Sequence, residues 1–383
     1  MSPRVPVKRA LYEWACERNR CLPADYAARF PHLSAWIDGT EQPTLKQLEA
    51  FATATHTPIG FFFGTEPPME AVPIHDFRTI AGKPLARPSP DLLDTIYVCL
   101  QRQEWYRDFA RGSGETALTF VGSAKVGDDV VAVAAEMART LGFDVATRRA
   151  MGTWTEALRR FIANAEDAGI LVMASGIVGS NTHRALDPDE FRGFALVDRL
   201  APLVFVNGSD SKSAQMFTLA HEIAHLWLGE TGVSDNVPSR TPHGDVERWC
   251  DSVAAELLVP MALFRTDYDR RAPLESEVAR LARVFKVSTL VILRRMHDAG
   301  GLGRDRFWQA YRAELERLAS LTGTASGGGD FYMTTAARVG KRFARALLVS
   351  ALEGQTLYTE AFRLLGVSNA QTLEKFGVAL GVT

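Results

Sequence analysis

The sequence predicts an α+β protein that is mostly helical, with a small sheet and several helical modules. Apolar residues recur at three- and four-residue steps through much of the 383-residue chain, as they do in amphipathic helices. Short apolar runs that predict buried strands are few, at 169–173, 191–196 and 202–206. The composition, 46% hydrophobic and 23% charged, is that of a globular protein, and the length suits two or three domains.

Changes in composition divide the chain into segments. Residues 67–90 are rich in Pro and Gly and predict a linker, and the Gly-rich run 322–330 predicts a hinge. The predicted segments are a helical bundle at 1–66, the linker at 67–90, a central domain at 91–299 with its core at 150–265 and a helix pair at 275–297, and a C-terminal helical module at 300–383.

A buried helix is predicted over 217–228. Ser209, Asp210 and Ser211 offer N-cap oxygens before it, and Gly229 is a suitable C-cap after it. An apolar run at 202–206, which predicts a strand, precedes this helix. The helix therefore has defined ends and a place in the core.

This helix carries the motif HExxH at His221, Glu222 and His225. Two histidines four residues apart lie on nearly the same helix face, so both imidazoles can reach one ion. Zinc favours such nitrogen pairs and leaves a position open for water, whose proton Glu222 can accept. The motif therefore predicts zinc-dependent hydrolysis, and the alternative is a core helix with two hydrogen-bonded histidines.

A third zinc ligand is expected from the helix predicted over 244–259. Glu247 and Asp251 are four residues apart, so both carboxylates can point the same way. We assign Glu247 as the ligand and Asp251 as the alternative, or as the partner that orients a histidine ring. His243 is a further candidate, as a ligand or as a donor to the developing oxyanion, although a surface position in the loop is favoured.

These two segments resemble the ImmA/IrrE metallopeptidases. Residues 217–225 read FTLAHEIAH and residues 247–260 read ERWCDSVAAELLVP, against the family patterns FTLAHELGH and ExxANxFAAxLLMP. The resemblance implies a zincin-like metallopeptidase core, zinc ligands at His221, His225 and Glu247, and catalysis by Glu222. Ala224, Cys250, Asp251, Val253 and Val259 depart from the pattern without removing a ligand. Asp in place of Asn leaves open which carboxylate binds the metal.

The N-terminal segment has a second resemblance. Residues 36–44 resemble the end of the recognition helix and the following loop in Cro/C1-type helix-turn-helix domains, which often precede this peptidase. Residues 1–66 hold seven Lys or Arg and seven acids, and 31–38 hold no Lys or Arg. Arg29, His32 and Ser34 are the candidates for DNA or partner contact. A DNA reader and a protein-interaction module both remain open.

Three further features concern how the parts interact. Residues 73–79, PIHDFRT, are expected to pack the linker against the catalytic domain, and the strand at 191–196 to be an edge strand that binds peptides by strand addition. The pair at 275–297 is helix-turn-helix-like, and Arg294 and Arg295 make it locally basic. Finally, Val339, Phe343, Leu347 and Leu348 are expected on one helix, beside a basic face of Arg338, Lys341, Arg342 and Arg345.

The expected function is a zinc-dependent endopeptidase of regulatory type that cleaves a repressor or antitoxin-like protein encoded nearby. The alternative is a DNA-binding regulator or toxin-antitoxin component with a structural or sensory metal site. The net charge of −2 excludes nucleic-acid binding driven by the whole protein, so DNA would bind only a local patch. Four cysteines without a CxxC pair, and the lack of a signal peptide or apolar span, indicate the cytoplasm and no membrane.

Overall fold

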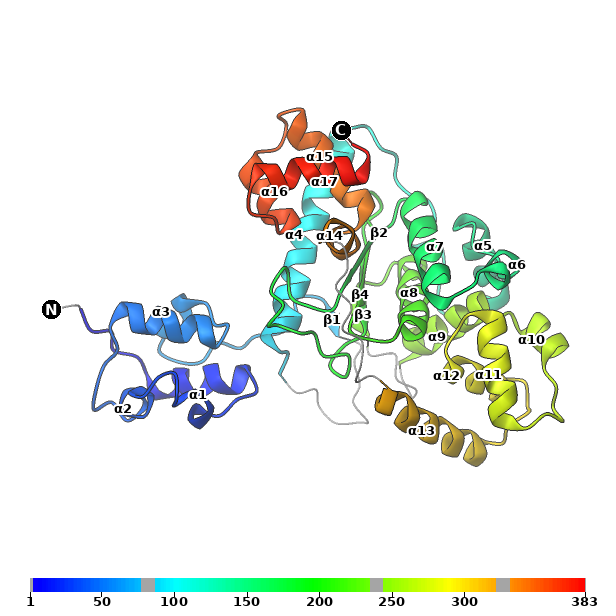
Figure 1. Ribbon diagram of the computed structural model, residues 1–383, viewed down its shortest axis with the longest axis horizontal. Helices are drawn as coiled ribbons and strands as arrows, with labels where there is room; N and C mark the ends of the chain where they lie inside the picture. The colour runs from blue at the N-terminus through cyan, green and yellow to red at the C-terminus, as the bar shows by residue number, and fades with distance from the viewer. Residues whose placement is uncertain (1–2, 77–86, 235–243, 322–330, 383) are drawn as a thin grey trace. The chain divides into compact units, whose positions relative to one another are not determined.

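The fold is known from a computed structural model, which describes residues 3–76, 87–234, 244–321 and 331–382. It is α+β and mostly helical with one small sheet, as predicted (Figure 1). The described residues form two compact units, one of residues 3–73 with 87–96 and one of the remainder. None of the helices in these ranges is both long enough and apolar enough to cross a membrane.

The N-terminal unit is a bundle of short helices around an aromatic core. Its elements are α1 (Arg9–Arg18), the 3-10 helix η1 (Pro23–Tyr26), α2 (Leu33–Ile37), α3 (Leu45–Ala54) and the 3-10 helix η2 (Ile59–Phe63). Phe51 lies at the centre, with its ring 5.6 Å from that of Tyr12 and 5.8 Å from that of Phe62. Thr44 caps α3 in a capping box with Gln47.

The second unit contains a five-stranded sheet in the order β1-β5-β3-β4-β2. The strands are β1 (His75–Asp76), β2 (Leu171–Ser175), β3 (Gly193–Leu196), β4 (Leu203–Asn207) and β5 (Gly232–Ser234). β3 runs antiparallel to both β4 and β5, whereas β2 is parallel to β4 and β1 is parallel to β5. Within the predicted linker segment, His75 and Asp76 therefore join the sheet, and residues 77–79 lie outside the described residues.

The interior position of β3 corrects the prediction of an edge strand. Gly193 pairs with Val206 of β4 on one side and with Ser234 of β5 on the other. The backbone of β3 is therefore already hydrogen-bonded along both sides, and strand addition by a peptide is excluded there. The interior position of β3 has no signal in the sequence, because β5 is only three residues long and has no distinct pattern.

Helices cover both faces of the sheet (Figure 1). Val172, Ala195 and Val204 lie in the same core cluster as helices α7 and α8. On the opposite face, Met173 Sδ lies 3.9 Å from Cys99 Sγ of α4, and Gln103 Nε2 of that helix donates to Leu196 O at 2.8 Å.

The helices that begin at or after residue 90 are α4 (Pro90–Gly112), α5 (Val130–Thr140), α6 (Val145–Ala150), α7 (Trp154–Asp167), α8 (Lys212–Leu228), α9 (Asp245–Leu258), α10 (Met261–Asp267), α11 (Leu274–Phe285), α12 (Thr289–Asp298), α13 (Arg304–Leu321), α14 (Phe331–Val339), α15 (Lys341–Leu352), α16 (Tyr358–Leu365) and α17 (Ala370–Leu380).

The helix pair predicted at 275–297 is present as α11 and α12, joined by a short turn. Ser288 caps α12 by accepting from Val291 N. Arg295 does not contribute to a basic surface, because it is buried and pairs with Glu256 at 2.7 Å. Only Arg294 of the two arginines keeps a side chain that is substantially exposed.

The C-terminal helices pack on the sheet, and the residues predicted on one helix are divided between two. On the predicted basic face, Lys341 and Arg345 are exposed. Gly340, with φ +83°, ends the helical run, so Val339 lies on α14 and Phe343 on α15. A Cβ at Gly340 would lie 2.8 Å from Val172 O, so the residue allows α14 and α15 to approach β2. Arg342 is paired at 3.1 Å with Glu115, and the predicted hinge 322–330 lies outside the described residues.

Glu166 of α7 joins the C-terminal helices to the rest of the unit. Its Oε1 accepts from Arg342 N at 3.0 Å, at the start of α15. Burial raises the pKa of Glu166 to about 7, although the N–H groups of Arg342 and Lys341 oppose this shift. The carboxyl group therefore holds a proton in the folded protein at pH values where the unfolded chain has lost it.

We expect the free energy of unfolding to fall as the pH rises from about 5 to about 8, because the folded state binds more protons than the unfolded state in this window. Glu166→Gln should remove this part of the slope and stabilise the protein by up to about 3 kcal/mol at pH 8. Urea unfolding at several pH values measures the difference. Asp167→Asn, at the exposed neighbouring position, is the control and should leave the slope unchanged.

Candidate metal centre

Helix α8 lies in the core and positions the HExxH motif. Ser211 caps its start by accepting from Ala214 N, and Gly229 ends it in the left-handed conformation with φ 77°. At its C-terminal end, the Trp227 ring stacks on Phe120 with the ring centroids 4.3 Å apart. Every residue from Thr218 to Trp227 is buried, so the helix is enclosed on all sides rather than along one stripe.

Three side chains from α8 and α9 converge. The Nε2 atoms of His221 and His225 are 3.0 Å apart, and the two oxygens of Glu247 lie 3.2 Å from His221 Nε2 and 3.1 Å from His225 Nε2. Both histidines are fully buried, and Glu247 is 5% exposed. Among the described residues these three are the group of His, Cys and acidic side chains that could hold one metal ion.

The donor spacing fits a tetrahedral zinc ion. Bonds of about 2.0–2.1 Å at tetrahedral angles place neighbouring donor atoms about 3.3 Å apart. The three distances between the imidazole nitrogens and the Glu247 oxygens, 3.0–3.2 Å, are close to this value. Two neutral imidazoles and one carboxylate are also a donor set that zinc prefers, and they leave the fourth position open.

Asp251 lies behind the cluster rather than within it. Its Oδ1 is 3.0 Å from His221 Nδ1, the ring nitrogen on the opposite side from Nε2. This contact holds the Nδ1 proton and directs the lone pair of Nε2 toward the other two donors. Of the two assignments left open for Asp251, the geometry favours the partner that orients the histidine.

The charges in the cluster keep Glu247 ionised. Burial opposes its charge, but His221 and His225 outweigh burial and hold the pKa of Glu247 well below its usual range. Burial likewise opposes a charge on His221, but Glu247 and Asp251 outweigh it and raise the pKa of His221 well above its usual value. Burial lowers the pKa of His225. A metal ion therefore finds a carboxylate ready to bind, and must displace a proton from the imidazole pair.

Glu222 lies against β3. It is fully buried, and a Cβ at Gly193 would lie 3.0 Å from Glu222 Cγ and 2.7 Å from Thr218 Cγ2. The same Cβ would lie 2.8 Å from the backbone oxygen of Phe205, which cannot rotate away. Gly193 therefore permits the close contact between α8 and the sheet that fixes the position of Glu222.

Gly193→Ala is expected to destabilise the protein by about 1–3 kcal/mol, because the added methyl group overpacks this contact. It should also lower activity, since Glu222 must move, whereas metal affinity should change little. Denaturant unfolding, metal content and turnover measured together test this. Gly244→Ala is the control, because a Cβ at that position meets no atom within 4 Å. A variant with wild-type stability and turnover would contradict the packing argument.

Two residues of the site carry no signal in the sequence. Ser234 ends β5, is fully buried, and its Oγ lies 3.4 Å from His225 Nε2. Gly193 is its partner across the sheet. Neither belongs to a motif, and they reach the site only because β3 and β5 pair beside α8.

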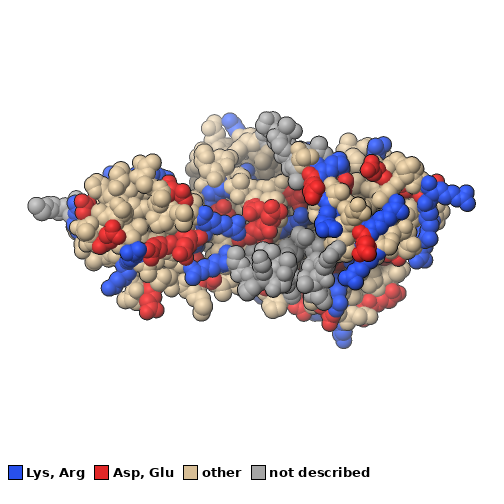
Figure 2. Space-filling model, turned by 90° about the horizontal axis from the view of Figure 1, so that it is seen from below, with Lys and Arg blue, Asp and Glu red and all other residues tan. Residues whose placement is uncertain are grey.

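The remaining candidates have different outcomes. His243 lies outside the described residues. In the N-terminal unit, the His32 ring lies 3.0 Å from Glu41, the Arg29 guanidinium lies over the Phe30 ring at 5.5 Å, and Ser34 is exposed. On the face shown in Figure 2, basic and acidic side chains are interspersed. DNA or partner contact by these three residues stays a prediction.

Cys250 is a core residue. It is fully buried on α9, and burial raises the pKa of its thiol well above the usual value. The thiol is therefore protonated and poorly reactive.

The comparison with known families indicates the class of the central domain. Residues 165–297 match the Peptidase M78 family, described as the IrrE N-terminal-like domain. This range contains α8 and α9, and with them His221, Glu222, His225 and Glu247. The match supports the resemblance to the ImmA/IrrE peptidases and, at the family level, indicates a peptidase.

A second match lies in the C-terminal helices. Residues 339–378 are similar to a domain of unknown function, DUF8813. They span most of α15 to α17, the helices that Glu166 joins to α7. None of the curated proteins compared with the chain matches it.

Proposed function

We propose that the protein is a zinc-dependent endopeptidase of regulatory type. The observation that carries the proposal is the convergence of His221, His225 and Glu247 within hydrogen-bond distance of one another, with Asp251 on the far side of His221. These three side chains would hold the zinc ion, and Glu222 would act as the general base. The match to a peptidase family over the same helices supports this reaction class.

Each residue has a separate task in peptide hydrolysis. Zinc, when bound, polarises the peptide carbonyl and the attacking water. Glu222 accepts the proton of that water and returns it to the leaving amine. Asp251 holds the tautomer of His221, and Ser234 lies beside His225, with its Oγ 3.4 Å from Nε2. Burial of the cluster excludes bulk water, which strengthens these charge interactions.

The proposed substrate is a repressor or antitoxin-like protein encoded nearby. The presence of a separate N-terminal helical unit supports this choice, because such a unit can bring the catalytic domain to a partner or to DNA. The alternative function is a DNA-binding regulator in which the metal site is structural or sensory. The helical bundle with an exposed Ser34 on α2 is the observation that keeps this alternative.

A single set of incubations distinguishes the two functions. The full-length protein is loaded with zinc and mixed with the product of each neighbouring repressor gene, with chelated protein and Glu222→Gln as inactive counterparts. We expect cleavage only by the zinc-loaded wild type, and recovery when zinc is returned. Full zinc occupancy with no cleavage, together with salt-dependent binding to operator DNA, would support the regulator instead.

A further inference from the structure

A cavity lies beside the metal cluster, between the start of β3 and helices α8, α9, α12 and α13. Its volume is about 130 Å³. The side chains that line it include those of Arg192, Phe217, Thr218, Asp251, Arg294 and Tyr311. All belong to described parts of the second unit, and none is among the proposed zinc ligands.

The cavity shares its walls with the candidate site. Asp251 lines it and contacts His221 Nδ1 at 3.0 Å. Phe217 lines it and is four residues before His221, with the two ring centroids 6.4 Å apart. Thr218 likewise precedes Glu222 by one helical turn, a separation of about 5–6 Å. A peptide residue spans about 3.5 Å, so a substrate side chain within one or two residues of a bond held at the metal can reach this cavity.

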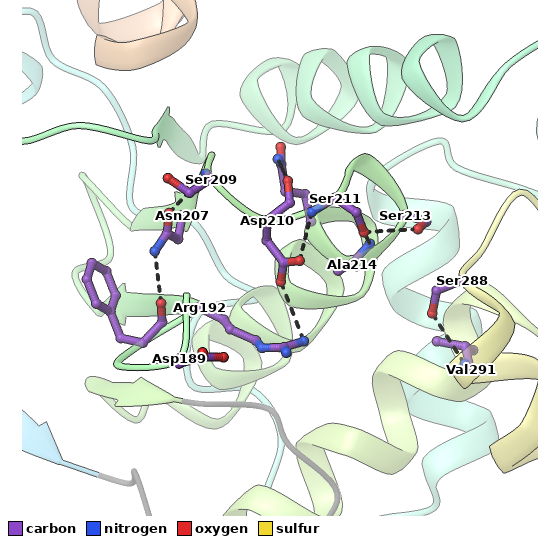
Figure 3. A network of polar contacts seen from close by, with 12 residues as sticks. Asp189, Arg192, Asn207, Ser209, Asp210, Ser211, Ser213, Ala214, Ser288 and Val291 are labelled. Carbon is purple, nitrogen blue, oxygen red and sulfur yellow. Dashed lines mark hydrogen bonds and ion pairs between the residues drawn. The ribbon is translucent and has the colours of Figure 1, made fainter. Parts of the chain in front are cut away.

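The lining has more hydrogen-bond donors than free acceptors. The ion pair between Arg192 and Asp210 is long, at 3.5 Å. The Nε of Arg192 is buried and has no hydrogen-bond partner among the described residues. Figure 3 shows Arg192 extending toward Asp210 at the start of α8, with Ser288 and Val291 of α12 nearby. Arg294 Nε is 3.5 Å from Asp298, longer than a charge-assisted hydrogen bond of about 2.8 Å. Both guanidinium groups therefore keep N–H groups for a ligand.

Tyr311 adds a hydroxyl to these donors. The side chain is 5% exposed and lines the cavity together with Arg192 and Arg294. Burial raises the pKa of the hydroxyl and keeps it protonated, although the charges of the two arginines oppose this shift. Of the two carboxylates in the lining, Asp251 is engaged by His221, and Asp298 lies 3.5 Å from Arg294 and 3.8 Å from Arg295. A ligand that supplies acceptors therefore suits the donors of Arg192, Arg294 and Tyr311.

The volume limits what can bind. A cavity of about 150 Å³ holds a benzene ring, which has about six non-hydrogen atoms. A cavity of 130 Å³ therefore has room for a side chain the size of glutamate. Phe217 supplies an apolar wall for the methylene groups of such a side chain.

We propose that this cavity binds a carboxylate of the substrate, and that Arg192, Arg294 and Tyr311 select peptide bonds followed by that carboxylate. The carboxylate comes either from a glutamate side chain or from the chain end of the substrate. This inference rests on the proposed peptidase function and adds its specificity. Arg192, Arg294 and Tyr311 are specificity-determining residues in it.

Cleavage of a peptide library tests the proposal with the zinc-loaded full-length protein. The library is randomised on both sides of the bond and has amidated C-termini, and a second set carries free C-terminal carboxylates. We expect bonds followed by Glu to be cut at least about tenfold faster than those followed by Gln. A preference confined to peptides with a free C-terminus would assign the carboxylate to the chain end.

Arg294→Gln and Tyr311→Phe should each reduce the ratio of Glu to Gln cleavage toward one, chiefly through a higher KM for the Glu peptide. The matched control is Arg283→Gln, on the exposed surface of α11 and outside the cavity lining. An unchanged ratio in both cavity variants, or a wild-type ratio near one for both sources of carboxylate, would overturn the proposal.

Binding separates this inference from the proposed function. Affinities of amidated Glu, Gln and Leu peptides for the Glu222→Gln protein are measured by fluorescence anisotropy, which needs no turnover. Glu-selective binding that Arg294→Gln abolishes supports the inference even where the wild type cuts nothing, whereas cleavage without carboxylate selection contradicts the inference and leaves the peptidase function in place.

Discussion

Glu222→Gln is expected to lower kcat by about 10²–10⁴-fold, the usual contribution of a general base, while zinc remains bound. The amide has nearly the same shape as the carboxylate, so the contact with Gly193 is retained, but it cannot accept a proton at neutral pH. KM should change much less than kcat. Steady-state kinetics on a cleaved peptide, together with metal content, measures the effect.

A residue earlier on the same helix provides a control for that variant. Gln215→Glu, one to two turns earlier on α8, changes a buried side chain that donates to Gly208 O at 3.1 Å and Asp210 O at 2.6 Å. This variant should lower the free energy of unfolding, whereas Glu222→Gln should lower kcat and leave the stability nearly unchanged. A Glu222→Gln protein with more than about a tenth of wild-type kcat would remove Glu222 from the proposed role.

Glu247→Gln is expected to weaken zinc binding by more than about 100-fold. Loss of a group that only supports a ligand lowers metal affinity about 10–100-fold, and this variant removes a ligand itself. The amide lacks the charge that offsets the ion and that now holds the two imidazoles in place. Zinc content after dialysis and a competition titration with a coloured chelator measure the change. Activity should fall with metal occupancy and return in part at high zinc concentration.

Glu256→Gln is the matched variant on the same helix. Glu256 is buried on α9 and pairs with Arg295 at 2.7 Å, away from the cluster. Its replacement should cost about 3 kcal/mol of stability, since it removes the closer of the two acidic partners of a buried arginine, yet zinc affinity should stay at the wild-type value. Equal zinc loss in both variants would mean that Glu247 acts through folding rather than as a ligand.

The parts of the site that depend on local spacing were predictable from the sequence. His221, Glu222 and His225 lie on one helix, and their separation alone brings two imidazoles together. Glu247 and Asp251 were named as a pair because they share a helix face. Which of them faces the cluster depends on how α9 crosses α8, and the structure places Glu247 inside and Asp251 on His221 Nδ1.

The parts that depend on pairing between distant segments were not predictable. β1 and β5 have two and three residues, too few for a hydrophobic period, so neither the interior position of β3 nor the role of Ser234 could be inferred. The helices were easier, since capping residues such as Thr44, Ser211 and Ser288 mark their starts. The break at Gly340 was missed because the approach to Val172 O that favours a glycine there is a tertiary contact.

The central place of β3 affects which proteins could be cut. A peptidase whose site lies beside an open strand can hold almost any extended chain through main-chain hydrogen bonds, independent of sequence. Here the strand nearest Glu222 has both sides occupied, by β4 and β5. Discrimination must then come from side chains and from the partner's own shape, which suits an enzyme that spares the bulk of cellular proteins and acts on few.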